Sequence, residues 1–415
     1  PDLQTGRAAS MRSADRAPTP EREGEMKPDG SVQRVVNAAG DPAWLVSGYE
    51  RVKELLGDPR ISRSHSDPRH PVRLTQPALF GGPMGDPETE RADHARMRRL
   101  LTRSFSARRM ENLRPRVERI VEELLAEMDR SGPPADFHEV VAFPLPILVI
   151  CELLGVPAAD REDFCRWSDE ATHMDHPARS RAGLQSLWRY IGALVERRHS
   201  IPGEDVISDL LEAAKLDPML TDDAVAHIAA GLLFAGHQTA VGIIDRGAVL
   251  LLTHPEQREA LQRDPGLAPL AVEEILRYPS PLERTRGARR GGGLPRYATV
   301  DIELDGVTIA AGDLVMFALQ DANQDEELFP DPARFDITRE KNPHLSFSHG
   351  LHFCLGAPLA RMELQHLFRR LFQTFPTLRL AVPVHELRPI REAVAGRVAE
   401  LPLSWRVASG ADQDV

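Results

Sequence analysis

Apolar residues recur every three to four positions through most of the chain after about residue 90. This is the spacing of a helix that buries one face and exposes the other. The pattern therefore predicts amphipathic helices over residues 90–105, 113–130, 181–200 and 204–216.

The longest apolar pattern covers residues 221–257 and predicts one long helix. Thr221 is a favourable N-cap, acidic residues follow in the first turn, and no proline interrupts the pattern before Pro255. A helix of roughly 30 residues would be about 45 Å long at 1.5 Å per residue. Because residues 228–233 are apolar on most sides, we expect this helix to run through the core.

Strand signals are few and local. Residues 297–319 alternate between apolar and polar positions in short runs, with a turn at Asp305 and Gly306. Apolar runs at residues 378–383 and 401–405 predict edge strands near the C-terminus. The expected fold class is mainly α with a small β part, in a single domain with a long central helix.

The two ends differ in composition from the rest of the chain. Residues 1–30 are polar, charged and rich in proline, and they predict a disordered leader. Residues 31–408 predict one folded domain, and residues 409–415 predict a flexible tail.

Charge and cysteine content narrow the possible partners and compartments. The net charge of the 415 residues is −11, which argues against nucleic acid as the main partner. Three widely separated cysteines do not form a disulfide framework and indicate a reducing, cytoplasmic compartment. The most apolar run, residues 140–151, is too short to span a bilayer and contains two prolines, so we expect no membrane association.

The stretch FSHGLHFCLG, from Phe347 to Gly356, contains one of the three cysteines. It reads as a loop that enters a helix at Cys354, where a helix N-terminus would favour a thiolate. Gly350 and Gly356 leave space for a close approach, and Phe347 supplies an aromatic wall. These features predict a pocket that presents one thiolate to a planar ligand. The alternative is a buried structural cysteine.

The pattern F-x-x-G-x-H-x-C-x-G resembles the haem-ligating loop of the cytochrome P-450 family in its soluble bacterial form. The resemblance extends along nearly the whole chain after about residue 35 and would make residues 31–408 the catalytic domain. It implies haem b as the cofactor, with Cys354 as the proximal thiolate ligand of the iron and Phe347 and Gly356 beside the haem. Thiolate ligation favours cleavage of the O–O bond.

Three further motifs agree with this resemblance, and the first is a pair of charged residues. Glu274 and Arg277 in EEILR lie on one helix face, and the family pairs them with an arginine that matches Arg334 in DPARF. The implied role of this buried charge network is structural support of the haem loop.

Residues that match the family's haem propionate ligands lie in three segments. The match implies propionate contacts for His94, Arg98, Arg296 and His352. Hydrogen bonds from cations to carboxylates are the expected chemistry. For His94 and Arg98 the alternative is a solvated helix face.

The sequence AGHQT lies midway along the long helix and matches the family's oxygen-activation motif. The resemblance implies that Gly236 makes room for O2 and that the Thr239 hydroxyl passes protons to it. Alternatively, the threonine only bonds the preceding turn of the helix. Gln238 departs from the family because it stands where an acid is usual, and an amide cannot titrate. Water chains or His237 would then have to carry protons.

Three segments are expected to shape substrate specificity: residues 61–90, residues 163–196 and the loop around Val394 and Ala395. About 19 residues separate Arg277 from Arg296, and the Arg- and Gly-rich extension at residues 284–293 predicts a flexible loop.

The resemblance implies a monooxygenase that hydroxylates or epoxidises a medium-sized organic molecule in secondary metabolism. The expected partners are O2, ferredoxin and an NAD(P)H-dependent ferredoxin reductase. Gln238 leaves open oxidative C–C or C–N coupling of aromatic substrates, and a haem protein that binds a ligand without turnover. Four arginines form either a docking face for an acidic electron donor or a solvated surface: Arg103, Arg108, Arg109 and Arg361.

Overall fold

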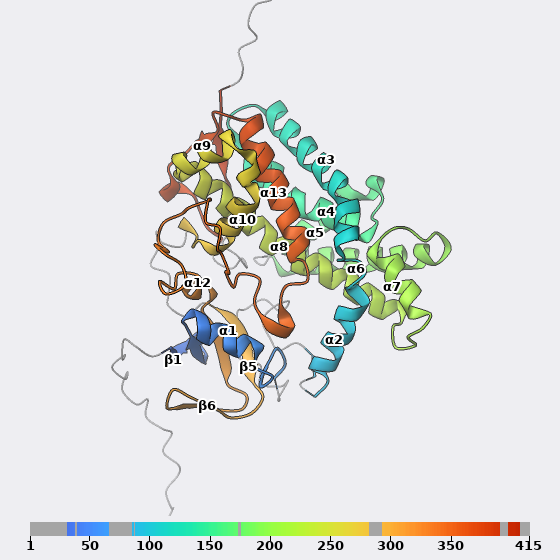
Figure 1. The fold of residues 1–415 in the computed structure, drawn as a ribbon. Coiled ribbons are helices and arrows are strands. Elements are labelled where there is room, and N and C mark those ends of the chain that lie inside the picture. Colours follow the sequence, from blue (N-terminus) through green and yellow to red (C-terminus); the bar gives the residue numbers. More distant parts are fainter. Residues whose placement is uncertain are drawn as a thin grey trace, which may run out of the picture. The chain divides into compact units, whose positions relative to one another are not determined.

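In this computed structural model most helices pack together in one part of the molecule, and the five-stranded sheet and the β6–β7 hairpin (residues 302–309) lie at the other end, beside α1 (Tyr49–Gly57) (Figure 1). Its described residues are 31–37, 40–65, 85–86, 88–172, 176–281, 293–390 and 397–406. The predicted leader at 1–30, the tail at 409–415, most of the extension at 284–293, and Val394 and Ala395 lie outside these residues. The domain boundaries therefore stay predictions.

The helices agree with the apolar periodicity to within a few residues. The first six are α1 (Tyr49–Gly57), α2 (Glu90–Leu101), α3 (Ala107–Ser131), α4 (Pro144–Leu154), α5 (Arg161–Thr172) and α6 (Pro177–Ser200). The others are α7 (Val206–Ala214), α8 (Asp222–Thr253), α9 (Pro255–Arg263), α10 (Ala268–Arg277), α12 (Leu319–Ala322) and α13 (Ala357–Thr374).

The predicted long helix is α8, with 32 residues, and the Thr221 hydroxyl accepts from the Ala224 N–H as an N-cap. By length and apolar composition α8 is the one helix in the described part of the chain that could cross a membrane. Half of its most apolar window is buried inside the protein, because α4, α6, α7 and α10 pack against it. Its hydrophobicity is therefore that of a core helix.

Three sheets contain the described strands. The five-stranded sheet has the order β1 (Val32–Val36), β2 (Pro42–Val46), β8 (Leu314–Phe317), β5 (Leu294–Ala298) and β3 (Ile61–Ser62), in which only β2 and β8 pair in parallel. A second sheet pairs β4 (Ala135–Asp136), β10 (Pro402–Ser404) and β9 (Arg379–Leu380). A hairpin pairs β6 (Ile302–Leu304) with β7 (Val307–Ile309).

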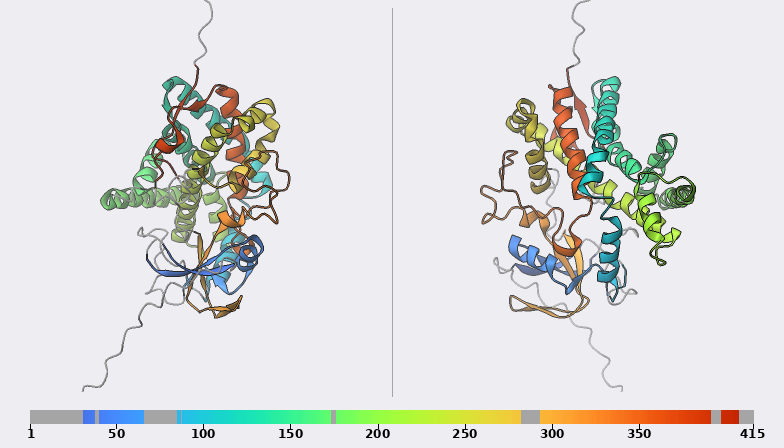
Figure 2. Two further views of the ribbon diagram at one scale, coloured as in Figure 1. Left: turned by 90° about the vertical axis from the view of Figure 1, so that its left-hand side faces the viewer. Right: turned by 45° about the vertical axis from the view of Figure 1, so that its right-hand side comes forward.

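The hairpin confirms the predicted turn, because Asp305 and Gly306 both have positive φ, at 50° and 79°. Strands β1 and β2 were not predicted. Both views of Figure 2 place these N-terminal strands beside the orange strands from the C-terminal half.

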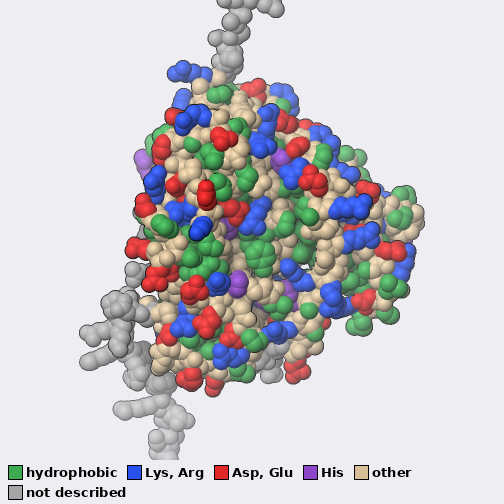
Figure 3. All heavy atoms as spheres, in the orientation of Figure 1, with side chains coloured by type: hydrophobic (Ala, Val, Ile, Leu, Met, Phe, Trp, Pro, Cys, Tyr) green, Lys and Arg blue, Asp and Glu red, His purple; other side chains and the backbone are tan. Residues whose placement is uncertain are grey.

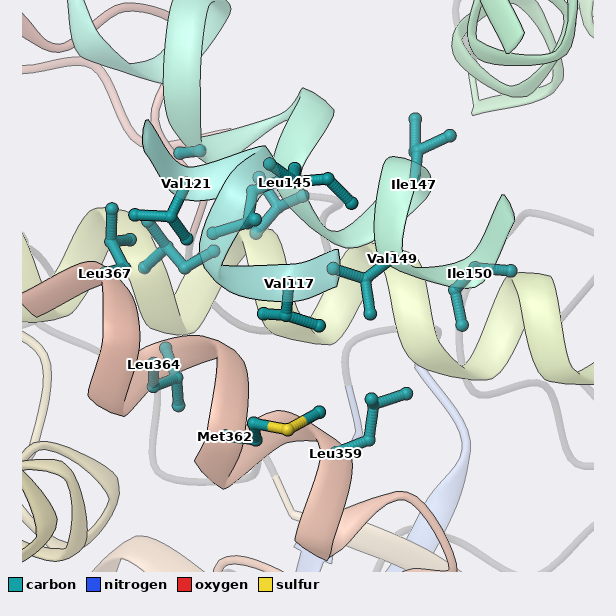
Figure 4. Packing of buried hydrophobic residues seen from close by; sticks show 14 of the residues in the cluster. Val117, Val121, Leu145, Ile147, Val149, Ile150, Leu359, Met362, Leu364 and Leu367 are labelled. Carbon is teal, nitrogen blue, oxygen red and sulfur yellow. The ribbon is translucent and has the colours of Figure 1, made fainter. Parts of the chain in front are cut away.

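The main hydrophobic core joins α3, α4, α8 and α13. Figure 4 shows Val117 of α3, Val149 of α4 and Leu364 of α13 among the aliphatic side chains of this cluster. Because α13 follows Cys354 directly, the packing of its buried face holds the end of the cysteine loop in place.

Candidate active site

The cysteine loop is a tight turn between a short 3-10 helix, Gly350–His352, and α13. The Cys354 N–H donates to the Phe347 carbonyl over 2.9 Å, which closes the loop. The helix begins at Ala357, three residues later than predicted, so Cys354 lies just before its N-terminus. The predicted approach of a thiol to free backbone N–H groups is nevertheless present.

The Cys354 side chain is reached by solvent, unlike the buried Cys151. Burial of its surroundings raises the pKa of the Cys354 thiol, whereas N–H groups of Gly356 and Ala357 and the charges of Arg98 and Arg361 lower it. Donors and cations thus converge on the sulfur, which suits a thiolate ligand better than an inert core cysteine.

The backbone geometry at position 350 requires glycine. Its φ is +68°, and a Cβ there would lie 3.0 Å from both the Gly57 Cα and the Leu56 carbonyl oxygen. We expect Gly350→Ala to lower the free energy of unfolding by about 1–3 kcal/mol, because both the strained φ and the backbone contact resist relief. Urea denaturation checks this. Gly356→Ala is the control with a small effect expected, because its added Cβ would make only a 3.9 Å contact; equal losses would contradict the argument.

Phe347 is buried behind the cysteine loop, where the Arg361 guanidinium lies 4.7 Å from its ring centre. Arg361 in turn pairs with Glu273 through two hydrogen bonds of 2.7 and 2.8 Å. Burial raises the pKa of Glu273, but hydrogen bonds from Arg361 and His344 outweigh it and bring the pKa to about 2.

A carboxyl group whose pKa is lowered on folding stabilises the fold at pH values above its ordinary pKa of 4.5. This contribution is lost as the pH falls from 4.5 toward 2. We expect Glu273→Gln to remove about 1–2 kcal/mol of stability at neutral pH, after allowance for solvent screening. Stability should then depend less steeply on pH between 4.5 and 2, measured by urea unfolding across that range. An unchanged slope would show that Glu273 is not the titrating group.

The four predicted propionate ligands converge from α2, β5 and the cysteine loop. The rings of His94 and His352 are 4.3 Å apart, and Arg98 Nη1 donates to the Phe353 carbonyl over 2.9 Å. Burial, with the nearby charges of Arg296 and Arg63, lowers the pKa of His352 to about 3. Burial and Arg63 also lower the pKa of Arg296 to about 10.

This cluster has excess positive charge and unused donors. The buried Nδ1 atoms of His94 and His352 form no hydrogen bond within the described residues. Glu90 supplies an acidic side chain here, with Oε1 3.1 Å from His352 Nε2. An anionic group fits such a cluster, because it would use the donors and offset the charge. Sequence reasoning missed Arg63 and Glu90, since neither belongs to a recognisable motif.

The Glu274–Arg277 pair is fully buried, with two hydrogen bonds of 2.8 Å. The prediction that the Arg334 side chain is the third member of this network was wrong. Its side chain is exposed and only its carbonyl takes part, accepting from Arg277 over 3.2 Å. Arg339, five residues later, lies 3.3 Å from Glu274 instead. The turn that starts at Asp331 directs the Arg334 side chain outward.

The AGHQT segment lies in an unbroken part of α8. Thr239 Oγ1 donates to the Ala235 carbonyl over 3.0 Å, which is the local bond that sequence analysis kept as an alternative. A Cβ on Gly236 would come within 3.0 Å of Ile150, so this glycine also allows close packing of α8 on α4. Gln238 Oε1 accepts from Arg397 over 2.7 Å.

His237 does not suit the proton-carrying role that sequence analysis left open. It is buried, and its ring packs 4.7 Å from that of Phe143. Burial and the charge of Arg397 lower its pKa to about 3, so it is neutral near pH 7.

The predicted basic face is largely neutralised. Arg103 and Arg109 both approach Asp209, at 3.4 and 2.7 Å, and Arg361 is held by Glu273. Figure 3 shows basic and acidic side chains interspersed on the face where α2, α3 and α13 lie.

The chain resembles known proteins in both sequence and fold. The cytochrome P-450 family profile matches residues 267–389. The chain is 39% identical to pentalenolactone synthase of Streptomyces exfoliatus over 92% of this chain and 94% of that one. It is 40% identical to mycinamicin IV hydroxylase/epoxidase of Micromonospora griseorubida, over 92% and 95%.

A solved structure of a mutant of the mixed-function P-450 MycG with mycinamicin IV superimposes with a TM-score of 0.81. It shares 41% identity and covers 90% of this chain and 93% of that one. Because identity near 40% extends over almost the full length of proteins that share the fold, this chain belongs to the cytochrome P-450 family and is a haem-containing monooxygenase that oxidises an organic substrate with O2 and external redox partners.

Proposed function

We propose that the protein is a haem b monooxygenase that hydroxylates or epoxidises a medium-sized secondary metabolite. The observation that carries this proposal is that the Cys354 thiol and the cluster of arginines and histidines meet at the cysteine loop, where His94 contacts His352 and Arg98 bonds the Phe353 carbonyl. The thiol suits a metal ion, and the cluster of arginines and histidines suits carboxylate groups. Relatives named for oxidising mycinamicin IV or forming pentalenolactone support a substrate of this class.

The residues present fit haem b at both of its ends. Cys354 would bind the iron, and Gly356 and Ala357 would donate their N–H groups to its sulfur. His94, Arg98, Arg296 and His352 would hold the propionates, with Arg63 adding positive charge. Phe347 would close the proximal side, where Arg361 fixes its ring. The bound haem supplies the oxidising power toward the substrate.

On the oxygen side, α8 would supply Gly236, Gln238 and Thr239. The Thr239 hydroxyl donates a hydrogen bond to the Ala235 carbonyl, and its oxygen keeps lone pairs that can accept a hydrogen bond from a water molecule. Gln238 holds no titratable proton, so its contribution is a hydrogen bond from a fixed amide.

Electron supply would come from a ferredoxin and its NAD(P)H-dependent reductase in the cytoplasm. Because Arg103, Arg109 and Arg361 are already paired, Arg108 is the remaining exposed arginine of the predicted docking face and the most direct contact for an acidic donor. Arg108→Glu should then slow reduction by ferredoxin.

Spectroscopy and turnover together test the proposal. Reduced protein with carbon monoxide should show the red-shifted band that gives the family its name. A ferredoxin, its reductase and NADPH should then yield an oxygenated product from a macrolide that shifts the haem spin state. A protein that shows the band but forms no product from any spin-shifting compound would be a binder, contrary to the proposal.

A further inference from the structure

A line of polar side chains runs from Gln238 into the interior. Arg397 Nη1 donates to Gln238 Oε1 over 2.7 Å, and Arg397 Nη2 lies 3.3 Å from His138 Nε2. His138 Nδ1 lies 2.8 Å from Asp245 Oδ2. The line therefore leaves α8 at Gln238 and returns to it at Asp245, through two residues that are distant in sequence.

The chemistry of the groups fixes the direction of each hydrogen bond. A guanidinium only donates, so His138 Nε2 accepts and its Nδ1–H donates to the Asp245 carboxylate. The His138 ring thus bridges the Arg397 guanidinium and the Asp245 carboxyl group. Burial lowers the pKa of Arg397, while Asp245 and Asp169 of α5 raise it. Burial also raises the pKa of Asp245, and His138 lowers it. Each charge of the line is therefore stabilised by the other.

Backbone contacts hold the bridging histidine. His138 begins a π-helical turn, His138–Ala142, which closes with a 2.9 Å bond from the Phe143 N–H to the His138 carbonyl. Asp136 Oδ1 accepts from the N–H groups of both His138 and Leu401, at 3.0 and 2.8 Å. Isolated π-helical turns are rare in proteins, and those that occur are often found at functional sites. The turn and the strand pair β4–β10 thus present His138 to Arg397 as a fixed acceptor.

The outer end of the line is the Gln238 amide. Its oxygen is taken by Arg397, whereas its Nε2 is buried and has no acceptor within the described residues. A side-chain amide can turn about its last bond and exchange oxygen for nitrogen. A donor-only partner at the oxygen prevents this, because a turned amide would present N–H groups to N–H groups.

We propose that Arg397 is a positioning residue for the oxygen chemistry: anchored by His138 and Asp245, it locks the Gln238 amide with its oxygen toward Arg397 and Nε2 as the remaining donor. This rests on the proposed role of residues 236–239 on the oxygen side of α8. An acidic residue at position 238 would form a salt bridge with Arg397. The amide forms no ion pair, so the arginine takes its counter-charge from Asp245, two hydrogen bonds away.

A double-mutant cycle between Arg397 and Gln238 tests the proposal. The haem-loaded protein is reduced and mixed with air-saturated buffer, and the return of the ferric spectrum is followed by stopped flow. Arg397→Met should speed this return by about tenfold, the scale on which small losses of positioning act. Gln238→Met should do the same, and the double variant should equal Gln238→Met alone, because the arginine acts through the amide. Asp245→Asn should speed the return only when Gln238 is present.

Arg258→Met is the matched control, since this half-buried arginine bonds the Leu378 carbonyl and lies outside the line. It should leave the return rate unchanged. An Arg397→Met effect that persists in full in the Gln238→Met background would overturn the proposal, because the arginine would then act on stability alone. A silent Gln238→Met variant would overturn it too. Failure of the proposed function is seen separately, as absence of the thiolate haem band in the parent protein.

Discussion

Replacement of Cys354 by serine is expected to abolish the carbon monoxide band of thiolate-bound haem and to reduce product formation by more than a hundredfold. Substitution of an outer-shell partner of a metal ligand already costs about 10–100-fold, and here the ligand itself is lost. The pigment content and the reduced, carbon monoxide-bound spectrum measure the first effect, and product per haem measures the second.

The other two cysteines provide the control. Cys151 is fully buried in α4, and burial raises the pKa of Cys165 in α5 to about 11, so neither presents a thiolate. Cys151→Ser and Cys165→Ser should keep the parent spectrum. If Cys354→Ser keeps it as well, the iron has another ligand and the site has been placed wrongly.

Arg277→Met is expected to lower the free energy of unfolding by about 3–5 kcal/mol, because it removes the two hydrogen bonds of the buried ion pair and leaves Arg339, at 3.3 Å, as the cation beside the buried Glu274 carboxylate. Arg277 forms five hydrogen bonds, two of them to Glu274 and the others to carbonyl groups of Asn323, Pro332 and Arg334. The same region supports the cysteine loop, since Asn323 Oδ1 accepts from the Leu345 N–H over 2.7 Å. Urea unfolding followed by circular dichroism, with haem retention, measures both effects.

Arg334→Met distinguishes the observed network from the one predicted from sequence. Its side chain is exposed, so the substitution should change stability by less than about 0.5 kcal/mol. Lys215→Met, which breaks an exposed pair with Glu212, should be similarly mild. A loss at Arg334 as large as that at Arg277 would restore Arg334 to the network.

The cysteine loop was predictable because its determinants are local. A glycine with positive φ and a cysteine just before a helix lie within ten residues, and the pattern of residue types specifies them together. The long helix was predictable for the same reason, since apolar spacing and the Thr221 cap act within a turn or two of the residues concerned.

The error at Arg334 arose where two arginines lie five residues apart in one loop. Residue type cannot show which of them faces inward. The positive φ of Asp331 and the turn after it send Arg334 to solvent and bring Arg339 to Glu274. Strands β1 and β2 were missed although each has five residues. The parallel partner of β2 is β8, which pairs residues 44–46 with residues 315–317, and local sequence does not show so distant a pairing.

The helical class of the fold was predictable from apolar periodicity, and the cysteine loop from a short motif. The residues that would face a haem were implied by the family resemblance of their motifs and stay a prediction. Only the tertiary structure brought Arg63 and Glu90 to the histidines, and Arg397, His138 and Asp245 to Gln238. Each of these contacts joins segments far apart in the chain, and the free energy that selects them comes from burial of the whole core.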